Sequence, residues 1–466
     1  MNVVVGNLGT LKHADFDLGD LTIICGDNNT GKTYASYALY GFIDFWKRGF
    51  TLNIDRASLD KLFSIGKVLL PIEYYNNNKR KEVELAAERY SKVLSKVFAS
   101  KDSLFSNSFF KITIPQGVIP HLNNSYKALF GSADKNIMSI SSFSDKELEV
   151  SLLMDKISEG DLPPKHIIAD IISDSLKHIL YSLDFPNTFI ISSERTGVAI
   201  FRKELDLTRN KLIDIISEKK TKIKPFSLLS KFTSDYALPI KDNVEFTRQL
   251  EDICKKESVL HKDIPDIMND YHNIAGGEYR VIRNELYFIP KEQRNIRLSM
   301  TESSSSVRSL LILGFYLQHE ADKGDLLIID EPELNLHPKK QRYLTRLFVR
   351  LVNYGIKVFI TTHSDYIVKE LNALIMLNNR KTQQHIIMER EHIKQDELLN
   401  SQKVKLYMSG KNPTLLEGNS RKVNCNTLTK APIDEMYGIE VKTFNETIND
   451  MNRIEEELMF KCEEEE

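Results

Sequence analysis

Short apolar runs separated by polar turns open the chain, at residues 3–5, 14–18 and 21–25, and each run is typical of a strand. Apolar residues then recur at helical spacing over 34–47, which predicts a buried helix. A second ordered stretch predicts a helix, a strand, a helix and a strand, at 305–321, 326–330, 338–354 and 357–362. This alternation is typical of a parallel sheet with helices on its faces.

The pattern between and after these stretches is more varied. An amphipathic helix is predicted over 82–98 and a strand over 108–114, and residues 280–290 are again typical of a strand. Residues 203–272 are charged and mostly helical in pattern, and they include the basic sequence KKTKIK at 219–224. Residues 380–466 are polar and less regular, with one last amphipathic helix predicted over 444–458.

Charge is distributed unevenly along the chain, which the net charge does not show. The 466 residues carry a formal net charge of −2, but residues 455–466 hold seven Glu and one Lys. Subtracting this local −6 from −2 leaves +4 on the rest, so a slightly basic body precedes an acidic tail. We interpret the tail as an element that attracts a basic partner surface.

Several classes of protein are excluded. The longest apolar run, Leu310 to Leu317, is far shorter than the ~18 residues of a membrane helix. The first residues lack the pattern of a secretory signal. The four cysteines lie far apart, which is typical of reduced thiols. We therefore expect a cytoplasmic protein without a membrane partner.

The sequence GDNNTGKT at 26–33 matches the phosphate-loop pattern, between a predicted strand and a predicted helix. Backbone N–H groups and the helix N-terminus favour phosphate there. The Lys32 ammonium can reach the β- and γ-phosphates, and the Thr33 hydroxyl can bind Mg²⁺. The predicted nucleotide-binding residues of this loop are Gly26, Asp27, Asn28, Asn29, Thr30, Gly31, Lys32 and Thr33. ATP and Mg²⁺ are the expected cofactors.

Two further motifs end predicted strands. In LLIIDEPELNLHP at 326–338, Asp330 can hold Mg²⁺ through water, and Glu331 can polarise an attacking water. An acidic pair alone is a weak signal, but it supplies what the phosphate loop lacks. His363 ends the strand in VFITTHSD and could donate to the γ-phosphate; a satisfied core histidine is the alternative. Strand C-termini of a parallel sheet collect ligands, which favours the catalytic role.

Together these motifs resemble the ABC-type ATPases of the RecF, SMC/Rad50 and OLD group. That resemblance implies an α/β head with a mostly parallel sheet, and two heads that enclose ATP in a homo-dimer or higher oligomer. The serines of MTESSSSVRSLL stand where the group's signature lies, which implies nucleotide contacts from Ser304, Ser305 and Ser306. A flexible serine loop is the alternative. The sequence departs from the group in having serine for the signature glycine, and Asn29 for a glycine of the phosphate loop.

A closer resemblance is to PtuA-like ATPase subunits of Septu and retron-linked Septu anti-phage systems. It is carried by SSERTG at 192–197, the serine signature, the two strand motifs, and DEMYGIEVKTFNETINDMN at 434–452. It implies antiviral defence, a separate HNH nuclease partner (PtuB-like), and, in retron systems, a reverse transcriptase with its DNA. Ser193, Glu194 and Arg195 would line the ATPase interior; Glu194 and Arg195 could equally form a structural ion pair.

We therefore expect an ABC-ATPase head with a helical insertion and a small C-terminal region. Residues 1–80 form its first part, 81–290 a largely helical insertion with a few strands, 291–379 its second part, and 380–466 a partner-docking region. The sequence lacks the carboxylate pattern of an OLD nuclease and the histidines of an HNH nuclease, so no intrinsic nuclease is predicted. Two other functions stay open: a RecF/SMC-type DNA repair or clamp ATPase, with nucleic acid as partner, and a nucleotide-binding scaffold with weak hydrolysis.

Overall fold

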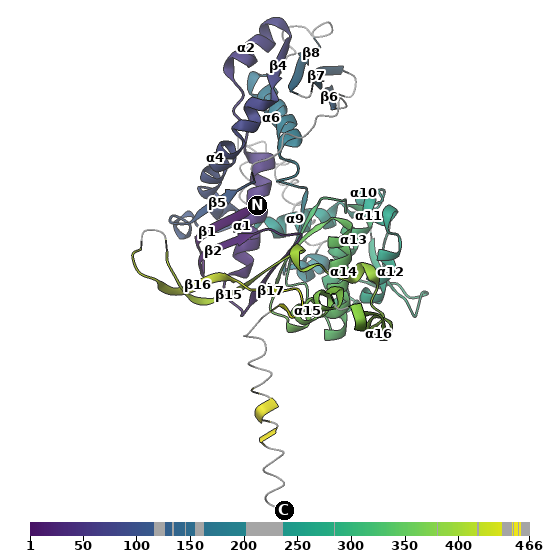
Figure 1. The fold of residues 1–466 in the computed structure, drawn as a ribbon. Helices are drawn as coiled ribbons and strands as arrows, with labels where there is room; N and C mark the ends of the chain where they lie inside the picture. Colours follow the sequence, from purple (N-terminus) through teal and green to yellow (C-terminus); the bar gives the residue numbers. More distant parts are fainter. Residues whose placement is uncertain are drawn as a thin grey trace, which may run out of the picture.

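The computed structural model describes residues 1–115, 126–132, 135–144, 146–153, 163–201, 236–283, 285–379, 381–416, 419–439, 450, 452–454 and 456–457. Its centre is a nine-stranded sheet in the order β5-β1-β2-β16-β15-β3-β14-β13-β9 (Figure 1). These strands are β1 (Asn2–Leu8), β2 (Leu11–Asp17), β3 (Leu21–Gly26), β5 (Phe109–Thr113), β9 (Thr188–Ile191), β13 (Leu326–Asp330), β14 (Lys357–Thr362), β15 (Val404–Thr414) and β16 (Val423–Lys430). Strands β9, β13, β14, β3 and β15 run parallel, whereas β5, β1 and β2 pair antiparallel, with the β1–β2 hairpin bordered by β5. The predicted α/β class with a mostly parallel sheet is confirmed.

The parallel strands β3, β13 and β14 are mostly apolar because both of their faces are buried. All five residues of β13 are buried, and successive side chains enter two different cores. Leu326 and Ile328 pack with α1 (Lys32–Asp44), and Leu327 and Ile329 pack with helices on the other face. Those helices are α13 (Ser305–His319), α14 (Pro338–Tyr354) and α15 (Asp365–Asn379). The sheet thus holds the ends of β3, β13 and β14 in fixed relative positions.

An arm extends from this head (Figure 1). It contains α2 (Arg56–Ile65), α3 (Ile72–Asn77), α4 (Lys79–Ser91), α6 (Lys165–Tyr181) and an antiparallel sheet in the order β4-β8-β7-β6. The strands of that sheet are β4 (Lys67–Pro71), β6 (Lys127–Ser132), β7 (Lys135–Ser144) and β8 (Glu147–Leu152). The arm therefore begins before residue 81, although the predicted domain boundaries as a whole stay a prediction.

Some predicted helices differ in extent. The helix over 34–47 is α1, which continues as a π-helical turn at Phe45–Gly49. The helix over 82–98 is α4 followed by the short α5 (Leu94–Val97). It breaks because the Ser91 hydroxyl turns to β5, where it accepts a hydrogen bond from Phe110 N at 2.9 Å, and because Val93 leaves helical geometry at φ −118°.

The second half of the insertion packs beside α13 and α14. It comprises α9 (Leu238–Arg248), α10 (Leu250–Ile253), α11 (Val259–Asp263), α12 (Asp266–Ala275) and a three-stranded sheet of β10 (Gly277–Ile282), β11 (Glu285–Pro290) and β12 (Leu298–Ser299). The basic sequence at 219–224 lies outside the described residues. No helix in the described part is both long enough and apolar enough to cross a membrane.

The C-terminal region differs most from expectation. The expectation that residues 380–466 are polar and less regular does not hold for β15 and β16, which lie in the middle of the main sheet. Val404 and Leu406 of β15 enter one core and Tyr407 the other, so this strand is buried like its neighbours. The remaining elements are α16 (Lys381–Glu391), β17 (Ile433–Asp434), β18 (Gly438–Ile439) and two short 3₁₀ turns, Gln395–Glu397 and Ser401–Lys403. Most of the helix predicted over 444–458 and most of the acidic tail lie outside the described residues, and the described positions 450, 452–454 and 456–457 are helical.

Candidate active site

The phosphate loop joins the C-terminus of β3 to the N-terminus of α1, as the motif predicts. Three of its residues have left-handed backbones, namely Gly26 (φ 142°), Asn29 (φ 62°) and Gly31 (φ 98°). A Cβ on Gly26 would lie 2.2 Å from the Ser409 carbonyl oxygen, so that position requires glycine. Asparagine tolerates the left-handed region better than most residues, so the loop keeps its turn with Asn29 in place of the expected glycine.

Lys32 closes the loop on itself. Its Nζ donates to the carbonyl oxygens of Gly26, at 2.8 Å, and Asp27, at 2.7 Å. Burial lowers the pKa of Lys32, and the carboxylates of Glu331, Asp330 and Glu333 oppose that shift. The Lys32 ammonium is therefore buried near carboxylates. A phosphate bound in the loop would give it a charged acceptor, which is a stronger partner than a backbone carbonyl oxygen.

Asp330 and Thr33 meet although 297 positions separate them. The Thr33 hydroxyl lies 3.2 and 3.1 Å from the two carboxylate oxygens of Asp330, which also accept a hydrogen bond from Thr361. Asp330 is 1% exposed, and burial raises its pKa to about 6, while the bond from Thr361 lowers it. In the described structure this buried carboxylate has no cationic side chain paired to it. A hydroxyl and a carboxylate side by side are hard oxygen donors that fit Mg²⁺.

Glu331 and His363 lie at the ends of adjacent strands. Glu331 has a left-handed backbone (φ 50°), and its N–H donates to Thr361 O at 3.0 Å. His363 Nδ1 lies 3.7 Å from Glu331 Oε1 and 3.2 Å from Glu333 Oε1. With 44% of its side chain exposed, His363 is not a satisfied core histidine. The structure thus brings together the two residues predicted to be catalytic.

Glu333 is a functional candidate that the sequence reading missed. It is 5% exposed, and its Oε1 accepts hydrogen bonds from Thr362 Oγ1 at 2.8 Å and from His363 N at 2.7 Å. These contacts fix both the backbone and the ring of His363, so Glu333 is a positioning residue. The available signal was a second carboxylate two residues after Glu331 in the same motif.

Arg195 links the end of β13 to α13 through hydrogen bonds to backbone carbonyl oxygens. Its guanidinium is buried and donates to the carbonyl oxygens of Ser192 at 3.1 Å, Ser309 at 2.9 Å, Asp330 at 2.8 Å and Glu331 at 2.6 Å. Its neighbour Glu194 instead accepts from the Tyr37 hydroxyl at 3.3 Å. Of the two alternatives, Arg195 therefore lines the interior, and in the described structure it is not ion-paired with Glu194. Burial lowers the pKa of Arg195, with Asp330 the largest opposing influence.

The three predicted signature serines begin α13. Ser304 is its N-cap and accepts from Val307 N at 3.3 Å, and the hydroxyls of Ser304 and Ser306 are 3.0 Å apart. Ser304 and Ser305 are exposed and Ser306 is half-buried. Within the described residues, their hydrogen bonds stay in their own turn rather than reaching the phosphate loop. A contact with nucleotide bound to a second head stays a prediction.

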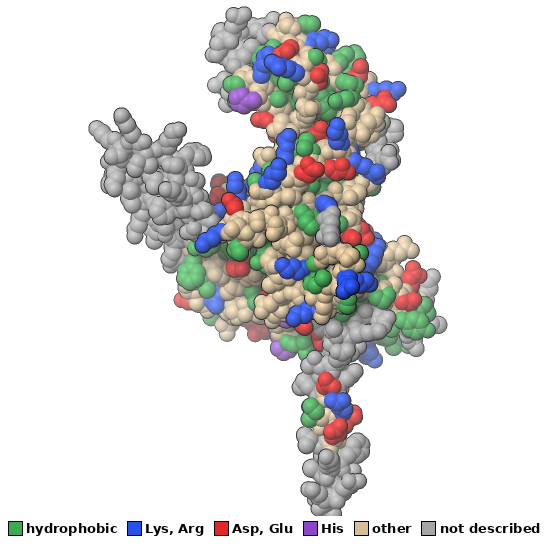
Figure 2. Space-filling view, turned by 90° about the vertical axis from the view of Figure 1, so that its left-hand side faces the viewer, with side chains coloured by type: hydrophobic (Ala, Val, Ile, Leu, Met, Phe, Trp, Pro, Cys, Tyr) green, Lys and Arg blue, Asp and Glu red, His purple; other side chains and the backbone are tan. Residues whose placement is uncertain are grey.

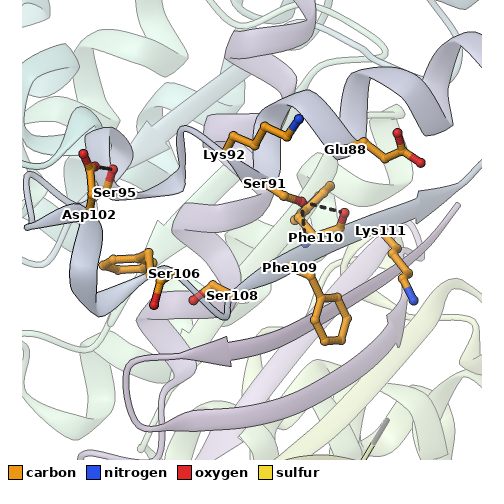
Figure 3. Close-up of a pocket in the computed structure, with 11 residues that line it drawn as sticks. Glu88, Ser91, Lys92, Ser95, Asp102, Ser106, Ser108, Phe109, Phe110 and Lys111 are labelled. Carbon is orange, nitrogen blue, oxygen red and sulfur yellow. Dashed lines mark hydrogen bonds between the residues drawn. The ribbon is translucent and has the colours of Figure 1, made fainter. Parts of the chain in front are cut away.

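A separate hollow of about 650 Å³ lies between α4–α5 and β5 (Figure 3). None of the predicted site residues lines it. Its hydroxyls are already bonded to protein, since Ser91 bonds with the Phe110 backbone and Ser95 donates to Asp102 at 2.5 Å. The candidate active site is therefore the phosphate loop with the ends of β13 and β14.

Comparisons with known proteins identify a family and solved structures to which this chain is similar. The family model described as "AAA ATPase domain" matches residues 1–368. Among solved structures, an SMC head bound to the C-terminal winged-helix domain of ScpA is 12% identical, with a TM-score of 0.34 over 92% of this chain and 96% of that one. The SMC head domain from Thermotoga maritima is 10% identical, with a TM-score of 0.30 over 93% and 98%. Both TM-scores are too low to bear on function, and no match was found among curated proteins.

The family match spans far more than half of the chain. It runs from β1 past His363 and so includes the phosphate loop, Arg195, the serines of α13 and the acidic strand end. The residues that converge in space are thus contained in one continuous family domain, and the chain belongs to the AAA ATPase domain family.

Proposed function

We propose that the chain hydrolyses ATP with Mg²⁺ at this site and uses the cycle of head closure and release to control a partner. The observation that carries the proposal is the contact between Thr33 and Asp330, next to Lys32 and Glu331. Loop N–H groups and Lys32 bind the phosphates, while Thr33 and Asp330 hold Mg²⁺, which neutralises charge on the phosphates. Glu331 polarises the attacking water, and His363 donates to the γ-phosphate.

Head dimerisation is the second part of the proposal. The exposed N-terminus of α13 presents Ser304 and Ser305, with N–H groups and hydroxyls that suit a phosphate. A second copy of the chain would bring its own ATP to this surface. Arg195 joins α13 to the Asp330–Glu331 turn through Ser309 O, so closure on a partner's nucleotide can be sensed at the acidic residues.

The partner that we propose is an HNH nuclease of the PtuB kind in an anti-phage defence complex. Support comes from the resemblance at 192–197 and 434–452, together with the acidic tail. A reverse transcriptase with its DNA is a further candidate partner. Deleting residues 455–466 should weaken the complex more at low salt than at high salt, because screening removes the attraction. Equal loss at both would leave the tail without an electrostatic role.

Two substitutions test the active site. Lys32→Ala should abolish ATP binding measured by isothermal titration calorimetry, whereas Lys61→Ala, at an exposed position of α2 in the arm, should not. Glu331→Gln should retain ATP, slow turnover and accumulate a dimer seen by light scattering. Unchanged hydrolysis in Glu331→Gln would refute its catalytic role and favour a nucleotide-binding scaffold.

The partner is tested by purifying the native complex and identifying its components by mass spectrometry. An HNH protein that co-purifies would support the defence role. A set of DNA-repair proteins in its place would contradict that role and favour the RecF/SMC-type clamp.

A further inference from the structure

The outer half of the β15–β16 ribbon projects beyond the main sheet (Figure 1). Strand β15 pairs with β3 from Val404 to Ser409, and β16 pairs with β2 at Thr427. Within the described residues, 411–414 and 423–426 pair with each other and with no other strand. Isolated two-stranded ribbons are marginally stable in water, so this one gains from a partner on its exposed faces.

The ribbon is strongly basic in a chain that is nearly neutral. Residues 403–430 contain five Lys and one Arg against a single Glu, while the whole chain carries −2. Lys411 is exposed in its outer half, Arg421 and Lys422 are exposed just before β16 at its tip, and none of the three has an ion-pair partner in the described structure. Figure 2 faces the side to which the ribbon projects, and Lys and Arg side chains stand out on the central surface of that view.

The side chains between these cations are polar. The outer half carries the amides of Asn412, Asn424 and Asn426 and the hydroxyl of Thr414, while Leu415 and Val423 are two exposed apolar residues near its tip. Amides can bond base edges, and Lys and Arg bind phosphates. An apolar protein partner would find no continuous apolar face here.

We propose that this ribbon is a binding element for duplex DNA. A two-stranded ribbon fits the major groove of B-form DNA, whereas the deep, narrow major groove of RNA duplexes excludes it. Lys411, Arg421 and Lys422 contact phosphates, and Asn424 and Asn426, which share one face of the ribbon with Lys411, face the groove. The inference goes beyond ATP hydrolysis and does not depend on it.

The root of the ribbon gives this surface a direct connection to the nucleotide site. Ser409 pairs with Gly26 of the phosphate loop, and its hydroxyl donates to Thr30 O at 3.2 Å. DNA bound to the ribbon would thus contact strand β15, which packs directly against the phosphate loop.

The experiment measures binding of a fluorescein-labelled 20-base-pair DNA duplex to the full chain by anisotropy, without nucleotide, over a range of salt concentrations. The triple variant Lys411→Gln/Arg421→Gln/Lys422→Gln should lose at least about tenfold in affinity at 100 mM salt. Its slope of log affinity against log salt should become shallower by about 2 to 3, since each lost phosphate contact contributes about 0.9.

A matched control removes three exposed lysines of the arm, in Lys61→Gln/Lys81→Gln/Lys146→Gln, and should bind DNA as the parent chain does. Equal affinity of the ribbon variant and the parent would overturn the proposal. So would binding of an RNA duplex as tight as that of DNA. Melting curves confirm folding, and ATP hydrolysis is assayed separately, so a failure of the proposed ATPase would not alter this outcome.

Discussion

We expect that substituting Arg195 lowers the free energy of unfolding strongly. Four backbone carbonyl oxygens depend on its guanidinium, and two of them belong to Asp330 and Glu331. Arg195→Met keeps much of the side-chain volume but removes every donor. An acceptor left unpaired costs about 1–3 kcal/mol. At about 1 kcal/mol each, a low value because water can reach the half-buried Glu331, we expect destabilisation of roughly 4 kcal/mol.

The same substitution should impair hydrolysis more than binding. Glu331 has a left-handed backbone that the bond from Arg195 helps to hold, and a shift of about 1 Å in a catalytic group can cost about 100-fold in rate. The phosphate loop has no direct bond to Arg195 in the described structure, so ATP affinity should change by less than about threefold.

Urea unfolding followed by circular dichroism measures the stability, and steady-state phosphate release measures the rate. Arg342→Met is the matched control, because 43% of the Arg342 side chain is exposed where it pairs with Glu370, and it should cost at most about 1 kcal/mol. If Arg195→Met unfolded within about 1 kcal/mol of the parent and hydrolysed ATP normally, the connecting role of Arg195 would be refuted.

Three other predictions follow from burial and close contact. Because burial raises the pKa of Asp330 to about 6, against about 3.9 when unfolded, the nucleotide-free fold binds the extra proton and should lose stability as pH rises from about 4 to 6. Asp330→Asn should remove that component, and parallel pH–stability curves for both proteins would contradict it. Gly26→Ala should destabilise the protein and abolish ATP binding, whereas Gly197→Ala, with nothing within 4 Å of the added Cβ, should do neither in melting and titration experiments. Lys79→Met should cost about 3–5 kcal/mol in urea unfolding by stranding the buried Asp184 carboxylate, and adding Asp184→Leu should recover most of that loss; no recovery would count against the ion pair.

The local parts of this site were predictable because their signals are short in sequence. A phosphate loop needs eight consecutive residues, and a buried parallel strand is recognised from a short apolar run such as Leu326–Ile329 of β13. The parallel arrangement then places Asp330 and His363 at one edge of the sheet. Contact between Thr33 and Asp330 follows from the same reasoning, although it spans most of the chain.

Contacts made by single residues were not predictable in the same way. Nothing near Arg195 in the sequence indicates that its partners are carbonyls of its own turn and of two distant segments, because backbone acceptors leave no mark in a sequence. Strand β15 was missed for a related reason: it is polar where it leaves the sheet and apolar only over its first few residues. The helix predicted over 82–98 breaks at Val93 because of a contact with β5. Helical periodicity carries no information about the position of that strand.

The position of β15 also sets an order of events during synthesis. The phosphate-loop strand β3 lies in the sheet between β14 and β15, and β15 begins at Val404. A ribosome that adds 5–20 residues per second needs roughly 20 to 75 seconds to travel from Gly26 to that strand. Throughout that interval one edge of β3 has no partner from its own chain, and exposed strand edges invite association with other chains. The nascent protein therefore has a time window in which a chaperone, or a second nascent copy, can occupy the place that β15 later takes.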